Sequence, residues 1–166
     1  VWLREAVEDW KTFAAIKRGP ILPRAVGDRT TVSGDMVYNI VRRVSTLAIG
    51  NPQCVALMNE LPDQARFYRL GPALATHPRF PAGTNVEFAV IESTSRVRIL
   101  IWERGVGPTE ASGTGACASA VAAAAFGGAA RDVDVISPGG TQHVEWTDAG
   151  LWLTGWAEII ATGEWA

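Results

Sequence analysis

The sequence predicts an α+β fold in which a mixed or antiparallel β-sheet wraps around one central apolar helix. Residues 113–126 carry small or apolar side chains on every side of a helical wheel, which is typical of a helix that is buried all round. Segments rich in Val, Ile and Thr lie on both sides of this helix in the chain and have the length and turn signals of strands. The 166 residues have the size of one domain and contain no internal repeat.

The N-terminal part of the chain has the weakest patterns. Residues 1–16 space their apolar side chains at helix-like intervals, whereas prolines and glycines in residues 19–34 indicate a loop with short strand pieces. Residues 36–49 are rich in Val, Ile, Tyr and Thr and predict a strand with room for a turn inside it. Gly50-Asn51-Pro52 then ends this strand.

The next segment predicts one strand and one short helix. Residues 54–58 form an apolar run of strand length. Residues 61–70 have the charge and spacing of a short helix, which we expect to end before Gly71-Pro72 because proline breaks helices. A separate helical turn is expected over residues 74–77.

A hairpin, a loop and the central helix follow. Residues 85–91 and 96–102 predict two strands that the turn-like Ser93-Thr94-Ser95 joins into a hairpin. Residues 103–111 are expected to form a loop before the helix at 113–126, whose many alanines combine high helix propensity with small side chains. Strands can therefore approach this helix closely.

The C-terminal segment predicts a β meander. Val133 and Val135 alternate with Asp132 and Asp134, as in a half-buried strand. Further strands are expected at three places, with a turn at Pro138-Gly139-Gly140 before the first: residues 143–146, 151–156 and 157–164.

The composition excludes several classes of function. A formal net charge of −2, with no cluster of Lys and Arg among aromatic residues, argues against a nucleic-acid partner. No stretch approaches the roughly 18 apolar residues that cross a membrane, so we expect no membrane span. Cys54 and Cys117 are too few for a disulfide framework, which indicates a reducing, cytoplasmic location. His77 and His143 show no metal-ligand spacing, so we predict no metal site.

The start of the apolar helix is the candidate site. Ser112-Gly113-Thr114-Gly115 places glycines where unpaired backbone N–H groups and the positive end of the helix dipole meet. Glycine lets a carboxylate approach these N–H groups without a side-chain clash, so this end is expected to bind an anion. The simpler interpretation is that Ser112 or Thr114 only caps the helix.

Other motifs fit these residues less well. Gly113 to Ala118 match the G-x-G-x-x-A dinucleotide fingerprint, and Asp132 follows at about the right interval, but no hydrophobic strand runs straight into Gly113. A phosphate-binding P-loop requires Gly-Lys-Ser/Thr after the glycines, and the chain has none there. The hydrolase elbow G-x-S-x-G fails because Glu110 precedes Ala111-Ser112.

Several motifs, taken in order, resemble those of diaminopimelate epimerases, from about Ser45 to Trp165. Residues 1–44 match that family poorly. The motifs are Gly50-Asn51-Pro52-Gln53-Cys54, Thr84-Asn85-Val86-Glu87-Phe88, Trp102-Glu103-Arg104-Gly105-Val106-Gly107 and Ala111-Ser112-Gly113-Thr114-Gly115-Ala116-Cys117-Ala118. The resemblance covers the C-terminal half of such an enzyme and implies a single lobe, in which a sheet folds around a helix and the substrate lies between two lobes.

The resemblance also implies roles for particular residues. Asn51 and Asn85 bind polar groups of a small amino-acid substrate, and Glu103 and Arg104 bind its distal amino and carboxylate ends. The N–H groups of Gly113 and Thr114 hold the carboxylate beside the reacting carbon. Without the resemblance, the two asparagines are more typical of turns, and Glu103-Arg104 of a solvated strand end.

Ser112 stands where the family has its catalytic cysteine. Inversion at an α-carbon without a cofactor needs one base and one acid on opposite faces, and a thiolate at a helix N-terminus can do this work. A serine hydroxyl has no accessible anion near neutral pH, and no histidine lies close in the sequence to activate it. Gln53 also replaces the family's usual histidine. We therefore expect this chain alone to be inactive or weakly active.

Three functions follow as hypotheses. The first is a cofactor-independent epimerase that interconverts LL- and meso-diaminopimelate, of which this chain is one half with Ser112 natural or engineered. The opposing cysteine belongs to the other lobe, and no Asn-Gly-x-x-Cys motif occurs here, so we expect a missing N-terminal lobe or a homodimer. The second is a non-catalytic binding or assembly module. The third is an isomerase of the same fold for another substrate, such as a proline epimerase or a phenazine-pathway isomerase.

Overall fold

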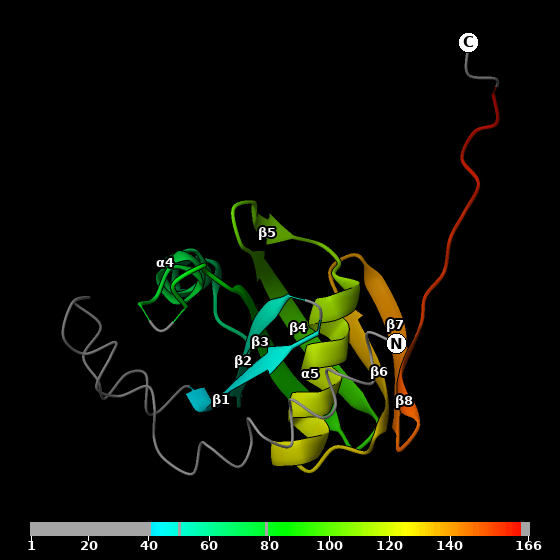
Figure 1. Ribbon diagram of the computed structural model, residues 1–166, viewed down its shortest axis with the longest axis horizontal. Helices are drawn as coiled ribbons and strands as arrows, with labels where there is room; N and C mark the ends of the chain where they lie inside the picture. Colours follow the sequence, from blue (N-terminus) through cyan, green and yellow to red (C-terminus); the bar gives the residue numbers. More distant parts are fainter. Residues whose placement is uncertain (1–40, 50, 79, 164–166) are drawn as a thin grey trace.

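The computed structural model describes residues 41–49, 51–78 and 80–163 (Figure 1), and the helix and loop expected at residues 1–34 lie outside this part of the chain. The elements, in chain order, are β1 (Val41–Ala48), β2 (Pro52–Met58), α4 (Gln64–Ala75), β3 (Asn85–Ser93), β4 (Arg96–Glu103), β5 (Gly107–Thr109), α5 (Gly113–Phe126), β6 (Asp132–Ser137), β7 (Gly140–Thr147) and β8 (Gly150–Thr154). The strands form one mixed sheet in the order β1-β2-β3-β4-β6-β7-β8, with β5 beside β4. The predicted α+β class is confirmed.

The connections decide which ends of the strands meet. β2 runs parallel to β3, and α4 connects them, while α5 lies between β4 and its parallel neighbour β6. β2 and β3 therefore start at the same edge of the sheet. Because β4 is antiparallel to β3, it ends at that edge. Helix α5 follows β4 after the short strand β5, so its first turn also lies there.

Helix α5 is enclosed by the sheet. It contacts β1 to β4 on one side and β6 to β8 on the other, and Figure 1 shows it standing within the curl of the strands. Its residues from Gly115 to Ala123 are buried, and the helix has the bounds expected from the sequence. The alanines let the strands approach from several sides, which confirms the central apolar helix.

Residues of β2, β3 and β4 alternate between two cores. Those at odd positions, such as Val55, Ala89 and Ile101, pack with α5. Those at even positions, such as Ala56 and Phe88, pack on the opposite face, where α4 lies. Both faces of these strands are thus buried, which explains why residues 54–58 read as a continuous apolar run. The alternation also means that polar residues at odd positions near the strand ends face α5.

Helix α4 does not end before Gly71-Pro72, as the sequence predicted, and residues 74–77 do not form a separate turn. Its N-cap is Asp63, and it continues through Pro72 to Ala75. Proline removes one N–H from the ladder, but Gly71 packs against the indole of Trp102, where a Cβ would lie 2.5 Å from Cδ2. This close tertiary contact favours the helix over the local break.

The remaining strands agree with most of the expectations. β3 and β4 form the predicted hairpin, and β6, β7 and β8 form the predicted meander. The expected loop 103–111 contains the short strand β5, which pairs with β4. The strand expected at residues 157–164 is wrong, since the described residues 155–163 contain none. Apolar composition favours a strand, but no neighbouring strand pairs with this segment within the described chain.

Neither α4 nor α5 has the length and apolar character needed to cross a membrane.

Candidate functional site

The first turn of α5 presents free hydrogen-bond donors. Ser112 is extended, with φ −151°, and its Oγ accepts a 3.2 Å hydrogen bond from the amide of Gly115. The amide of Ala116 donates to the carbonyl of Ser112 at 2.9 Å. Within the part of the chain that the structure describes, nothing accepts from the amides of Gly113 and Thr114. Ser112 is therefore the cap, and the two amides beyond it remain open to an anion.

Gln53 ties the start of β2 to this turn. Its Nε2 donates to Asn51 Oδ1 at 2.7 Å and to Thr114 Oγ1 at 3.0 Å. Gln53 is fully buried, whereas its two acceptors are half-buried, so the two bonds are partly shielded from water. Gln53 thereby links Asn51 and Thr114, two residues that the sequence analysis named as substrate-binding.

Asn85 joins the start of β3 to the end of β4. Its Oδ1 accepts a 2.9 Å hydrogen bond from the backbone N–H of Arg104, and the residue is nearly buried. This bond orients the side-chain amide, whose NH₂ group can donate to a ligand. The side-chain amide of Asn51 is oriented in the same way, because its Oδ1 accepts a hydrogen bond from Gln53.

Glu103 and Arg104 lie at the same edge. Thr109 on β5 donates to Glu103 Oε1 at 3.2 Å, which fixes the carboxylate against the short strand. Arg104 is exposed, and its Nη1 donates to the carbonyl of Ala82 at 2.7 Å. A Cβ on Gly83 would lie 2.8 Å from Arg104 Cδ, so glycine permits this approach. The structure thus places every residue predicted for the site at one edge of the sheet or in the first turn of α5.

Glu87 belongs to the same edge and was not predicted as a site residue. It is fully buried, and neither carboxylate oxygen has a hydrogen-bond partner among the described residues. Burial, with a contribution from the charge of Glu103, raises the pKa of Glu87 to about 8. Its odd position on β3 points it toward α5, like Ala89. The signal in the sequence was an acidic residue inside an apolar strand.

The two cysteines are buried thiols. Cys117 lies within α5, five residues after Ser112. Burial raises the pKa of the Cys117 thiol to about 11, so it is a neutral thiol at neutral pH. A neutral buried thiol is a poor base for removing a proton from carbon.

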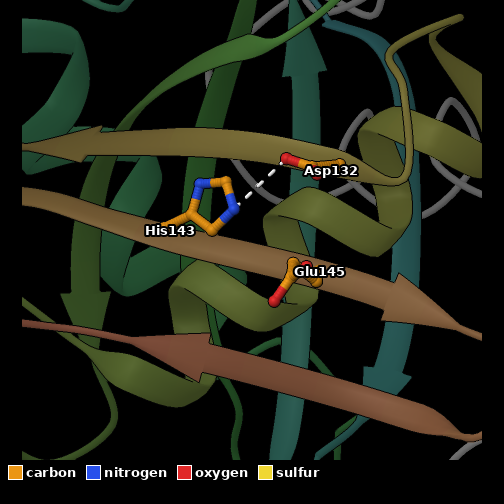
Figure 2. Close-up of side chains that lie close together, drawn as sticks. All are labelled: Asp132, His143 and Glu145. Carbon is orange, nitrogen blue, oxygen red and sulfur yellow. Dashed lines mark ion pairs between the residues drawn. The ribbon is translucent and has the colours of Figure 1, made fainter.

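A second polar cluster lies on the outer face of the meander, away from α5. Figure 2 shows the side chains of Asp132, His143 and Glu145 lying close together on β6 and β7. His143 Nε2 lies 3.2 Å from Asp132 Oδ1, and Nδ1 lies 2.9 Å from Asp134 Oδ1. The hydrogen bond with Asp134 raises the pKa of His143, and the charges of Asp132, Asp134 and Glu145 add to this effect. The sequence showed no ligand spacing because cross-strand register, not sequence distance, brings these groups together.

Comparisons with known proteins agree with the motifs. A family model described as diaminopimelate epimerase matches residues 45–164. The diaminopimelate epimerase of Desulforudis audaxviator (strain MP104C) is 49% identical over 124 residues, which cover 74% of this chain and 44% of that protein. That of Heliobacterium modesticaldum (strain ATCC 51547 / Ice1) is 42% identical over 131 residues, which cover 78% and 46%.

A solved structure from Enterococcus faecalis, described as a phenazine biosynthesis protein of the PhzF family, has a TM-score of 0.48 and 15% identity, and it covers 59% of this chain and 35% of that chain. The present chain spans about half the length of the curated relatives it matches.

Proposed function

This chain belongs to the diaminopimelate epimerase family, and from that premise we propose that it forms one lobe of a cofactor-independent amino-acid epimerase that interconverts LL- and meso-diaminopimelate. The lobe binds the substrate carboxylate at the start of α5. The open amides of Gly113 and Thr114, beside a Thr114 side chain that Gln53 holds in place, are the observation that carries the proposal. An anion at a helix N-terminus gains from both the N–H groups and the helix dipole.

The asparagines complete the carboxylate end of the proposed site. Asn51 and Asn85 each use Oδ1 within the protein, and each can offer its NH₂ group to the substrate as a donor. Both are therefore donors, as a carboxylate requires. The hydrogen bonds to their oxygens favour this orientation of the two amides.

Glu103 and Arg104 recognise the distal end of the substrate. A carboxylate at Glu103 pairs with the distal ammonium group, and the guanidinium of Arg104 pairs with the distal carboxylate. The hydrogen bonds from Thr109 to Glu103 and from Arg104 to Ala82 hold these two groups before the substrate arrives. A preformed pair of opposite charges selects a zwitterionic end over an apolar one.

Ser112 limits the chemistry of this lobe. Its hydroxyl can hold the first turn of α5 but cannot supply a base near neutral pH. The reaction removes the α-proton on one face and returns a proton on the other, so it needs a second acid or base from outside the described residues. We therefore expect binding without efficient turnover in the present chain.

The test restores the thiol. Ser112→Cys is introduced into the chain joined to an N-terminal lobe from a family member, and exchange of the substrate α-proton with solvent deuterium is followed by NMR. The cysteine form should exchange faster than the serine form by at least tenfold, the usual range for a positioned general base being about 10²- to 10⁴-fold. Ala111→Cys, which keeps Ser112 and places a thiol one residue earlier, is the matched control and should remain slow. Equal exchange in the serine and cysteine forms would contradict the role assigned to this position.

A non-catalytic binding or assembly module is the second candidate. It is favoured by the engagement of the Ser112 hydroxyl as a helix cap and by the neutral, buried thiol of Cys117. Two copies then associate to imitate the two-lobed arrangement. Sedimentation of this chain with and without meso-diaminopimelate tests the idea, and a particle that stays monomeric and does not bind the ligand would count against it.

A further inference from the structure

A buried carboxyl group lies directly beneath the first turn of α5. An ideal Cβ on Gly115 would lie 2.9 Å from Glu87 Oε1 and 3.1 Å from Ser112 Oγ, so both oxygens approach the same point on the helix. Glu87 is fully buried, and its oxygens have no hydrogen-bond partner within the described chain. Such an unpartnered acid in a native core requires an explanation.

The surroundings of Glu87 favour its neutral form. On β4, Glu103 is a like charge that raises the pKa of Glu87, after burial itself. On β2, the neighbouring polar side chain is the uncharged amide of Gln53, whose Oε1 is also buried without a partner among the described residues. Helix α5 brings its first-turn backbone and the hydroxyl of Ser112. No cation contributes to the pKa of Glu87, so the carboxyl group keeps its proton at neutral pH.

We propose that Glu87 controls the affinity of the carboxylate site, and that a ligand carboxylate binds at Gly113 and Thr114 only while Glu87 is neutral. This inference rests on the proposed function, because it concerns the same end of α5. The proton on Glu87 becomes part of the binding site. The inference concerns binding alone and does not require the present chain to catalyse a reaction.

The carboxyl group of Glu87 and the carboxylate of the ligand compete for the N-terminal end of α5. When Glu87 is neutral, the positive end of the dipole and the two open amides act on the ligand carboxylate. When Glu87 is ionised, its negative charge offsets the positive end of the helix dipole. It also repels the carboxylate of the ligand. Two carboxylates therefore exclude one another unless one carries a proton. Binding of the ligand must in turn raise the pKa of Glu87, because the two equilibria are linked.

The experiment uses the chain as it exists, with meso-diaminopimelate as the ligand. The affinity is measured by isothermal titration calorimetry at intervals from pH 6 to pH 9.5, and the ¹⁵N–¹H shifts of Gly113 and Thr114 at pH 6 locate the bound ligand. Above the pKa of Glu87 the affinity should fall, approaching tenfold for each pH unit when neutral and ionised forms differ strongly. Glu87→Gln keeps the shape of the neutral acid and should lose this fall. Because the amino groups of the ligand titrate equally with both proteins, the comparison isolates Glu87.

Glu92→Gln is the matched control. Glu92 lies on the same strand but is largely exposed and pairs with Arg98, so its variant should keep the pH dependence of the unmodified chain. Should Glu87→Gln fold poorly, ¹³C labelling of the Glu87 carboxyl carbon gives the answer without a variant. Saturation with meso-diaminopimelate should raise the pKa read from that carbon.

Two results overturn the inference while leaving the proposed site intact: binding whose pH dependence is the same in Glu87→Gln as in the unmodified chain, and a Glu87 carboxyl that is already ionised at pH 6. Failure of the Gly113 and Thr114 amides to respond to the ligand at pH 6 would overturn the carboxylate site itself and, with it, this inference. The two failures are thus distinguishable.

Discussion

The side-chain amide of Gln53 on β2 donates a 3.0 Å hydrogen bond to the hydroxyl of Thr114 in the first turn of α5. The two residues are 61 positions apart in the chain. Through this bond the edge of the sheet sets the position of the helix end, and Asn51 is fixed by the same amide. The geometry of the proposed carboxylate site therefore depends on the packing of α5 against β2.

Thr114→Val should lower the stability of the protein. The substitution keeps the shape of the side chain but leaves the buried Gln53 with Asn51 as its acceptor, at a cost of about 1–2 kcal/mol in the free energy of unfolding. Urea denaturation followed by circular dichroism measures the change. Thr141→Val, at an exposed position on β7, is the control and should change stability by less than about 0.5 kcal/mol. Similar values for the two variants would show that the Gln53–Thr114 bond contributes nothing.

Ser112→Ala should weaken the start of α5. Loss of an N-cap side chain typically costs about 1 kcal/mol, because the amide of Gly115 loses its acceptor. Ser112→Asn retains a capping oxygen and should stay within a few tenths of a kcal/mol of the unmodified chain. Thermal and urea unfolding of the two variants give the comparison. A Ser112→Asn protein as unstable as Ser112→Ala would argue that the hydroxyl acts by something other than capping.

Gly71→Ala should destabilise the protein even though alanine is the better helix former. The helix gains about 1 kcal/mol from the exchange, but the new methyl group would meet the Trp102 indole at 2.5 Å. Overpacking of this kind costs about 1–3 kcal/mol or more. Gly155→Ala, whose Cβ would have no heavy atom nearer than 4.0 Å, is the control. If Gly71→Ala raised the free energy of unfolding, α4 would not be in tight contact with Trp102 at this position.

Glu87 should make stability depend on pH in a definite direction. Its pKa is raised from 4.5 to about 8 in the folded protein, so its contribution is fully present below pH 4.5 and is lost as the pH rises toward 8. Over this interval the unmodified chain should lose up to about 1.4 kcal/mol for each pH unit relative to Glu87→Gln. Urea titrations of both proteins at pH 5 and pH 8.5 measure the difference. A constant difference between them would show that Glu87 titrates normally.

Asp134→Asn should lower the pKa of His143. The hydrogen bond from the ring to Asp134 is the main cause of the raised value, and the charge of the carboxylate adds to it. Because the folded pKa is raised, His143 stabilises the protein below pH 6.5, and this contribution disappears as the pH rises through the folded value. NMR titration of the imidazole protons reports the pKa directly. Glu145→Gln should have a smaller effect, and a larger one would reverse the order of the two partners.

The sequence predicted the elements whose pattern is local. Helix α5 has the expected bounds because alanine content, an N-cap serine and a following glycine are all contained within a few residues. The hairpin of β3 and β4 was expected for the same reason. The end of α4 and the strand at 157–164 were predicted wrongly. In the first case a contact with Trp102 overrides the Gly71-Pro72 signal, and in the second no partner strand lies beside the segment within the described chain.

By itself, the sequence determined the family and the apolar helix, because these follow from short motifs and from the periodicity of side chains. Only the tertiary structure decided that Gln53 reaches Thr114 and that Glu87 is buried beneath Gly115. The protonation of a carboxyl group depends on the water removed from it and on charges that distant strands bring near. No local sequence pattern predicts that desolvation. The protonation state of Glu87 is therefore set only when β3, β4 and α5 pack together.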